Sequence, residues 1–334
     1  MTTAMRRPAK FAAVLTAAAV LVAGCGSGAS KANAAATIDG RTISVDDIQS
    51  RVEKVMQNNT FVQNLQQQRK LDLLSRSILT REVSYELTAV AAQRENLRVD
   101  ETAVAQRAEE LAKPKQSDPT AIEQNLSTAT DQAFDPREVA RNELLTEELA
   151  KSYLTRLQVT MTLGITTGPE AKKQAQDMAK QLADNPAKAT EILAPLQTKA
   201  PGFKMSIITG VLVAQEAGFE LATSPVISAQ PNTVVAFSLA PHMVQNQGEN
   251  QWFIAYITDR STNATLSEQE RDTAGAVPPE LLNKIGQRLV SQYISDIKFE
   301  IGPRYGVWDP IGNNVAPRAE EVSGYQYTAR AAKP

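Results

Sequence analysis

Apolar residues in the first half of the chain recur at spacings of three and four, the pattern of amphipathic helices. The longest stripe runs from Leu71 to Val90. A second, near the C-terminus, places Leu282, Ile285 and Leu289 on one face. Helices are predicted over residues 44–57, 61–96, 99–113, 136–157 and 280–297. The late stripe needs a partner, and we expect the N-terminal helices to supply it, which would make the helical module discontinuous in sequence.

The pattern changes near Val159, where short runs of β-branched and aromatic residues replace the helical spacing. Strands are predicted over residues 159–165, 234–239 and 252–258, with helices between the first two. Near the N-terminus, Asp39-Gly40 between two short strand-like pieces predicts a hairpin, and Ser44 after it predicts a helix N-cap. The predicted fold class is therefore α+β: a mainly helical module with an inserted small sheet domain.

The first residues predict export. Arg6, Arg7 and Lys10 precede an apolar run over residues 11–23, which spans about 20 Å as a helix and falls short of the roughly 30 Å hydrocarbon core. Such a segment is typical of a signal peptide. The adjacent Arg6-Arg7 leaves both the twin-arginine and the general export route open.

The end of that segment, residues 21–25, reads Leu-Val-Ala-Gly-Cys and resembles the lipobox of bacterial lipoproteins. The resemblance implies cleavage before Cys25 and acylation of its thiol, which would anchor the protein to the outer face of the cytoplasmic membrane. The alternative is an ordinary secretory peptide with an incidental cysteine. The resulting division is a signal peptide (1–24), a flexible tether (25–36), a helical module (37–157 with 277–312), a small α+β domain (158–260), a linker (261–276) and a loose tail (313–334).

Composition and motifs argue against several function classes. The net charge of −2 comes with no basic stripe, so nucleic-acid binding is not expected. No phosphate-binding or dinucleotide fingerprint occurs, and no cofactor or metal is expected. The single histidine, His242, has no second histidine and no free thiol to act with, so it is interpreted as an exposed loop residue. The adjacent carboxylates Glu109-Glu110 and Glu147-Glu148 are interpreted as solvated helix surface. No catalytic residue is therefore predicted.

Three segments resemble extracytoplasmic chaperones of the SurA and PrsA type. Residues 36–44 are similar to their "V-N-G-x-x-I-T" opening, and residues 71–79 with 99–104 resemble a helical segment that follows. Residues 301–310, Ile-Gly-Pro-Arg-Tyr-Gly-Val-Trp-Asp-Pro, are similar to the close of actinobacterial lipoproteins with a SurA-like N-terminal domain. The resemblance covers residues 36–112 and 277–310, the two parts of the predicted module.

In that family a prolyl isomerase domain of the parvulin type often lies between the two parts, and residues 158–260 are similar to a parvulin in length and element order. Active parvulins carry histidines in their first and last strands. Here the corresponding strands, around Val159–Leu163 and Gln251–Ile257, contain none. Little or no isomerase activity is therefore expected.

The resemblance implies a membrane-anchored, ATP-independent chaperone for unfolded or newly exported polypeptides. Alternatives are an active, divergent prolyl isomerase and an envelope scaffold lipoprotein with one dedicated partner. The sequence leaves the oligomeric state open. Tyr305 and Trp308 are predicted to form a structural clasp on the helical module. The candidate client-binding residues, expected in an apolar crevice between helices, are Leu65, Leu74, Ile78, Tyr85, Tyr153 and Leu289.

Overall fold

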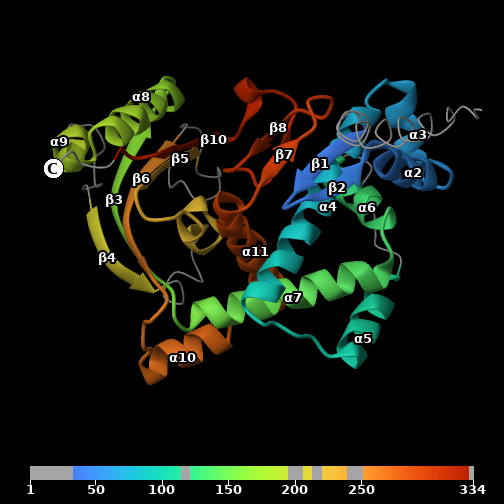
Figure 1. The fold of residues 1–334 in the computed structure, drawn as a ribbon, viewed down its shortest axis with the longest axis horizontal. Helices are drawn as coiled ribbons and strands as arrows, with labels where there is room; N and C mark the ends of the chain where they lie inside the picture. The colour runs from blue at the N-terminus through green and yellow to red at the C-terminus, as the bar shows by residue number, and fades with distance from the viewer. Residues whose placement is uncertain (1–32, 114–120, 195–205, 213–219, 239–250, 331–334) are drawn as a thin grey trace, which may run out of the picture.

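The computed structural model describes residues 33–113, 121–194, 206–212, 220–238 and 251–330. The N-terminal helices gather on one side of the molecule, and a five-stranded antiparallel sheet with its own covering helices lies on the other (Figure 1). The predicted α+β class is confirmed. The predicted signal peptide, Cys25 and His242 lie outside the described residues.

The N-terminal hairpin and helix cap follow the local sequence signals. Strands β1 (Ala34–Ile38) and β2 (Arg41–Ser44) pair antiparallel, and Asp39 and Gly40 at their turn both have positive φ, as a two-residue hairpin requires. The backbone N–H of Asp47 donates to the Ser44 hydroxyl at 3.0 Å and caps helix α2 (Val45–Met56). Both predictions are confirmed.

The helix predicted over residues 61–96 is two helices. Helix α3 (Thr60–Gln67) ends where Arg69 adopts a φ of +56°, and α4 (Leu71–Arg94) begins after it. A non-glycine residue in this conformation stops the helical hydrogen-bond ladder. The apolar stripe of α4 is the centre of the main core: Leu74, Ile78 and Leu87 are fully buried.

The next three helices are α5 (Glu101–Leu111), α6 (Ile122–Gln132) and α7 (Pro136–Leu154). Of these, α6 and α7 pack against α4, and α5 packs against α7. Asp100 and Asp135 cap α5 and α7 with their side chains. Helix α7 also packs against α11 (Pro279–Val290), which returns from the C-terminal part of the chain (Figure 1). The two helices approach closely at Gly286, where a Cβ would lie 2.0 Å from the carbonyl oxygen of Thr146.

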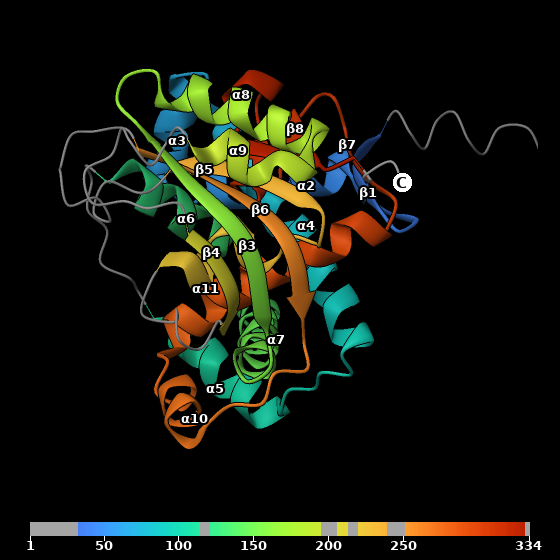
Figure 2. The same ribbon diagram turned by 90° about the vertical axis from the view of Figure 1, so that its left-hand side faces the viewer.

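The middle of the chain forms the large sheet, with the strand order β10-β5-β6-β3-β4. Helices α8 and α9 lie across one face of it (Figure 2) and cover that face with small residues such as Ala175 and Ala179. On the opposite face, Val235 and Ile257 belong to the same core cluster as the N-terminal helices. The elements of this unit are β3 (Gln158–Thr167), α8 (Ala171–Asp184), η1 (Pro186–Lys188), α9 (Ala189–Leu193), β4 (Ser206–Leu212), η3 (Glu220–Thr223), η4 (Pro225–Ile227), β5 (Thr233–Ser238) and β6 (Gln251–Ser261).

The predicted linker over residues 261–276 contains a helix, α10 (Glu268–Gly275). Ser267 and Glu270 form a reciprocal capping box at its start, so a local signal stabilises helix in a stretch otherwise rich in polar residues. The helix predicted to reach Ile297 also differs: α11 ends at Val290 and continues as the 3-10 helix η6 (Ser291–Asp296).

The prediction of a loose tail over residues 313–334 is wrong for its described part. Strand β10 (Gly324–Thr328) pairs along its whole length with β5 and forms one edge of the large sheet. Tyr325 and Tyr327 pack against the core beneath α8, which supplies the burial that holds the strand in place. The other late elements are β7 (Phe299–Ile301), which pairs with β1, the hairpin of β8 (Val307–Asp309) and β9 (Asn314–Ala316), and η7 (Ala319–Glu321).

Candidate functional site

The structure places the predicted client-binding residues mainly in the core. Leu65 and Tyr153 are 5% and 4% exposed, and Tyr85 is half-buried. Leu74, Ile78 and Leu289 are fully buried. An apolar stripe marks the face that a helix packs inward, so these residues do not form an open crevice.

An open recess does lie beside them, between α2, the start of α4 and the loop before β8; we call it the α2–α4 groove. Its volume is about 480 Å³. Val52, Met56, Leu71 and Tyr305 give it an apolar lining, and Glu53 and Arg304 stand on its rim. A recess of this size accommodates several side chains of a bound chain.

The predicted clasp residues hold the C-terminal loop against the helical module. Tyr305 is 6% exposed, and burial raises the pKa of its hydroxyl. Trp308 packs edge-on against Phe299 with ring centroids 5.3 Å apart. Both clasp residues pack with the main core, and Tyr305 also forms one wall of the α2–α4 groove.

A second recess lies between α4, α7 and α11 and is polar; we call it the polar cavity. Its volume is about 190 Å³. A chain of hydrogen bonds follows one side: the Gln287 amide donates to the Asn283 oxygen at 2.5 Å, and the Asn283 amide donates to the Thr146 hydroxyl at 2.9 Å. The Asn313 amide donates to the backbone carbonyl oxygen of the same Gln287 at 2.9 Å. These contacts join the returning helix to the N-terminal module through side chains.

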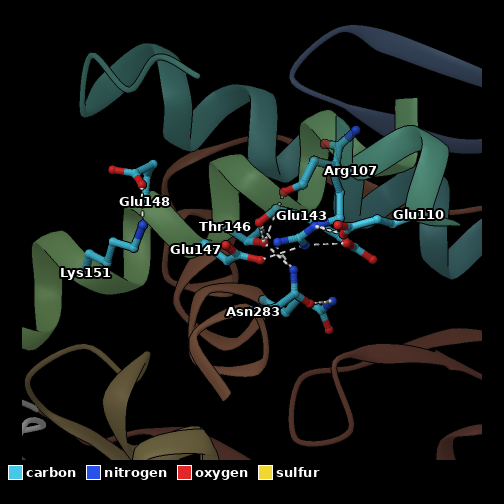
Figure 3. Close-up of polar contacts among 10 residues, drawn as sticks. Arg107, Glu110, Glu143, Thr146, Glu147, Glu148, Lys151 and Asn283 are labelled. Atoms are coloured by element: carbon cyan, nitrogen blue, oxygen red, sulfur yellow. Dashed lines mark hydrogen bonds and ion pairs between the residues drawn. The ribbon is translucent and has the colours of Figure 1, made fainter. Parts of the chain in front are cut away.

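The charged groups at the polar cavity are paired. Arg107 of α5 donates to Glu143 and to the buried Glu147, both at 2.9 Å (Figure 3). Glu148 points away from this group and pairs with Lys151 at 2.6 Å (Figure 3). The interpretation of Glu147-Glu148 as solvated surface is therefore correct for Glu148 and wrong for Glu147, whose carboxylate the guanidinium of Arg107 compensates.

Arg81 and Tyr85 line the polar cavity from α4. Arg81 pairs with Asp131 at 2.9 Å, and Tyr85 packs edge-on against Phe134 with centroids 5.2 Å apart. Burial raises the pKa of Tyr85 to about 12, so its hydroxyl keeps its proton over the whole physiological range. That hydroxyl is buried and makes no hydrogen bond of good geometry within the described part of the chain.

A third polar group, the Glu95 cluster, joins the helical module to the sheet unit. The hydroxyls of Tyr153 and Tyr293 both donate to the Glu95 carboxylate at 2.8 Å, and Arg156 donates to it at 2.7 Å. Burial acts to raise the pKa of Glu95, but these three donors outweigh it and hold the pKa below the ordinary value. On the sheet side, Arg260 of β6 lies over the Tyr153 ring at 5.4 Å.

The described carboxylates that line the two recesses are not gathered into a metal site. Within the described ranges, histidine, cysteine, aspartate and glutamate side chains form no cluster of three or more that would hold a metal ion. In the same part of the chain, no helix combines the length and hydrophobicity needed to cross a bilayer.

The sequence analysis predicted neither recess, although the polar residues at helical spacing on α4 are visible in the sequence.

Comparison with known proteins finds similarity to a family model and to solved structures. Residues 4–143 match the family model of the SurA-like N-terminal domain. The crystal structure of the foldase protein PrsA from Lactococcus lactis is similar over 81% of this chain and 95% of that chain, with 14% sequence identity and a TM-score of 0.25. No curated protein matches the sequence.

Proposed function

We propose that this chain, which carries a SurA-like N-terminal domain over residues 4–143, is a chaperone that binds unfolded polypeptides without ATP. The observation that carries the proposal is the α2–α4 groove. It lies within the SurA-like domain and is closed on one side by Tyr305 from the returning C-terminal segment. An unfolded chain gains free energy by removing apolar side chains from water, and the groove offers a surface for that.

The composition of the groove suits weak and unselective binding. Met56 and Leu71 are half-buried, so they contribute apolar surface that a client side chain covers. Methionine adapts to side chains of different shape because it is unbranched. On the rim, Glu53 and Arg304 form no ion pair with another described residue, so a charge of either sign on the client finds an opposite one. The entropy lost by ordering an unfolded segment keeps the affinity modest.

Isomerase activity is not part of this proposal. Prolyl isomerisation requires a site that lowers a barrier of roughly 18–20 kcal/mol for peptide rotation. The strands β3 and β6, which hold the first and last strand positions of the inserted unit, carry no histidine, and the chain has one histidine and one cysteine in all. A protease-coupled assay on an Xaa-Pro peptide tests this point: the expected result is the uncatalysed rate at micromolar protein.

We further propose that the chaperone acts at the outer face of the cytoplasmic membrane, anchored through acylated Cys25. The support is the sequence Leu-Val-Ala-Gly-Cys at residues 21–25 after a short apolar run. Stable attachment needs more than one acyl chain. Cell fractionation tests the anchor: the full-length protein is expected in the membrane fraction, and Cys25→Ser is expected in the soluble exported fraction.

The chaperone proposal is tested with the soluble protein that begins after Cys25. It is expected to suppress the aggregation of several chemically unfolded clients at near-stoichiometric ratios, with no nucleotide present. Absence of suppression across all clients refutes the proposal. Recovery of one stoichiometric partner from solubilised membranes, without suppression, favours the scaffold alternative.

A further inference from the structure

One face of α4 is polar although it is turned into the molecule. Six of its residues line the polar cavity: Ser77, Thr80, Arg81, Ser84, Tyr85 and Thr88. They follow each other at spacings of three and one, so they lie on one face of the helix. None of them is exposed, and Thr88 is 2% exposed. A helix face directed toward neighbouring helices is normally apolar. Two of these side chains form hydrogen bonds with neighbouring elements, Ser77 with the Thr130 hydroxyl and Thr80 with the backbone N–H of Val315. The rest of the face, around Ser84 and Tyr85, calls for a reason other than these bonds.

The helices opposite, α7 and α11, also present polar side chains to the cavity. Asn142 and Thr146 of α7 and Asn283 and Gln287 of α11 meet the polar face of α4 across the cavity. Ligand sites in helical bundles are built in this way, from side chains on facing helices. Most of these groups are amides and hydroxyls, which both donate and accept hydrogen bonds.

The cavity is not suited to an ion. Its cation, Arg81, is paired with Asp131 at 2.9 Å, and its anion, Glu143, is paired with Arg107 at 2.9 Å. A charged ligand would have to break one of these pairs or remain uncompensated in a buried site, which is costly. A neutral ligand that forms hydrogen bonds has neither problem.

Some hydrogen-bonding capacity at the cavity is unused. The Asn313 side-chain oxygen and the Tyr85 hydroxyl are buried, and neither makes a hydrogen bond of good geometry among the described residues, although the Arg81 guanidinium lies beside the Tyr85 hydroxyl. Both residues line the cavity. A buried polar atom without a partner is unfavourable, so a ligand that supplies one is stabilised. A carboxamide meets both needs, because it donates two N–H groups and accepts at its oxygen.

The volume of the polar cavity limits the size of a ligand. The volume of about 190 Å³ is below the range of about 300–1,000 Å³ that is usual for whole small molecules. We propose that the polar cavity is a second client subsite, which takes the uncharged carboxamide side chain of a glutamine or asparagine in an unfolded polypeptide. This inference rests on the proposed chaperone function. It adds a polar selection to the apolar contacts of the α2–α4 groove.

The test compares short fluorescent peptides that differ at one central position, glutamine, methionine or glutamate, by fluorescence anisotropy. One or two new hydrogen bonds predict that the wild-type protein binds the glutamine peptide about 3–30-fold more tightly than the methionine peptide. The glutamate peptide is expected to bind more weakly than the glutamine peptide, because its carboxylate finds no free cation in the cavity.

Two variants and one control test whether the cavity is the origin of the preference for glutamine. Ser84→Met fills it and is expected to remove the preference for glutamine. Ala89→Met, an identical side chain on the exposed face of the same helix, is expected to retain it. Asn313→Gly removes the free acceptor oxygen while it keeps a backbone φ of +54° accessible, and it is expected to weaken the preference. Thermal melting identifies any variant that fails to fold.

Equal affinity of the wild-type protein for the glutamine and methionine peptides overturns the proposal. A preference that survives in folded Ser84→Met and Asn313→Gly also overturns it, because another site would then select the amide. If wild-type protein suppresses aggregation but binds no peptide, the subsite alone is refuted. If it does not suppress aggregation, the chaperone function fails and the subsite fails with it.

Discussion

The close crossing of α7 and α11 makes Gly286→Ala a sharp test of how the C-terminal helix is held. The added methyl group would lie 2.0 Å from the carbonyl oxygen of Thr146, and 2.5 Å from its carbonyl carbon. Ordinary contacts of this kind need about 3.5 Å, so α11 must move away by more than about 1 Å. The obstructing atoms are backbone, so no change of rotamer relieves the contact.

The expected loss is about 2–3 kcal/mol in the free energy of unfolding, at the upper end of the usual cost of overpacking. The shift also strains the bond between Asn283 and the Thr146 hydroxyl, which closes one side of the polar cavity. The measurement is urea denaturation followed by circular dichroism, with the same slope assumed for both proteins.

Gly275→Ala is the matched control, because a Cβ there meets no atom within 4 Å. We expect its stability to be equal to or slightly above that of the wild type, since the unfolded chain loses freedom. If Gly286→Ala and Gly275→Ala denature at the same urea concentration as the wild type, the close approach of α11 to α7 is refuted.

Three further outcomes are expected. Met56→Glu places a charge in the α2–α4 groove and should weaken aggregation suppression several-fold. Ile122→Glu changes an apolar side chain that is 61% exposed outside the groove, and it should leave suppression unchanged. Equal effects of the two variants would contradict client binding in the groove. Glu95→Gln should lose about 2 kcal/mol of stability at neutral pH, because three donors lose a charged acceptor. Because folding lowers the pKa of Glu95, its contribution to the free energy of unfolding is complete above the unfolded pKa near 4.5 and is lost as the pH falls through the lower folded value. Urea denaturation between pH 6 and 3 should therefore show stability falling more steeply for the wild type than for the variant. Removal of residues 318–334 should lower the free energy of unfolding by about 3 kcal/mol, because each hydrogen bond between β10 and β5 contributes about 1 kcal/mol. Unchanged stability would support the prediction of a loose tail instead.

Most of the helices and strands were predictable because local signals agree with the tertiary structure. The Asp39-Gly40 turn and the Ser44 cap act within a few residues, so no distant contact is needed to identify them. The partner of the late apolar stripe was predictable too, since α11 had to cover its buried face. The capping box of α10 was equally visible, but the polar residues around it favoured a linker.

Other features depend on contacts that one sequence does not reveal. Strand β10 alternates Tyr325 and Tyr327 with polar residues, but the edge of β5 that stabilises it lies about ninety residues earlier. The two recesses were missed for a different reason. Periodicity identifies the apolar face of α4 and assigns the opposite face to water, whereas part of that polar face, around Ser84, is turned toward α7 and α11.

Both of the larger sheets pair a strand from the C-terminal part of the chain with a strand that comes much earlier, and this sets a condition on biosynthesis. Strand β1 pairs with β7, from which most of the chain separates it, and β5 pairs with β10, which also follows much later in the sequence. A ribosome produces the early strands first, and their open edges must wait for the last residues. Both sheets therefore reach their full strand pairing only after the C-terminal residues have been synthesised.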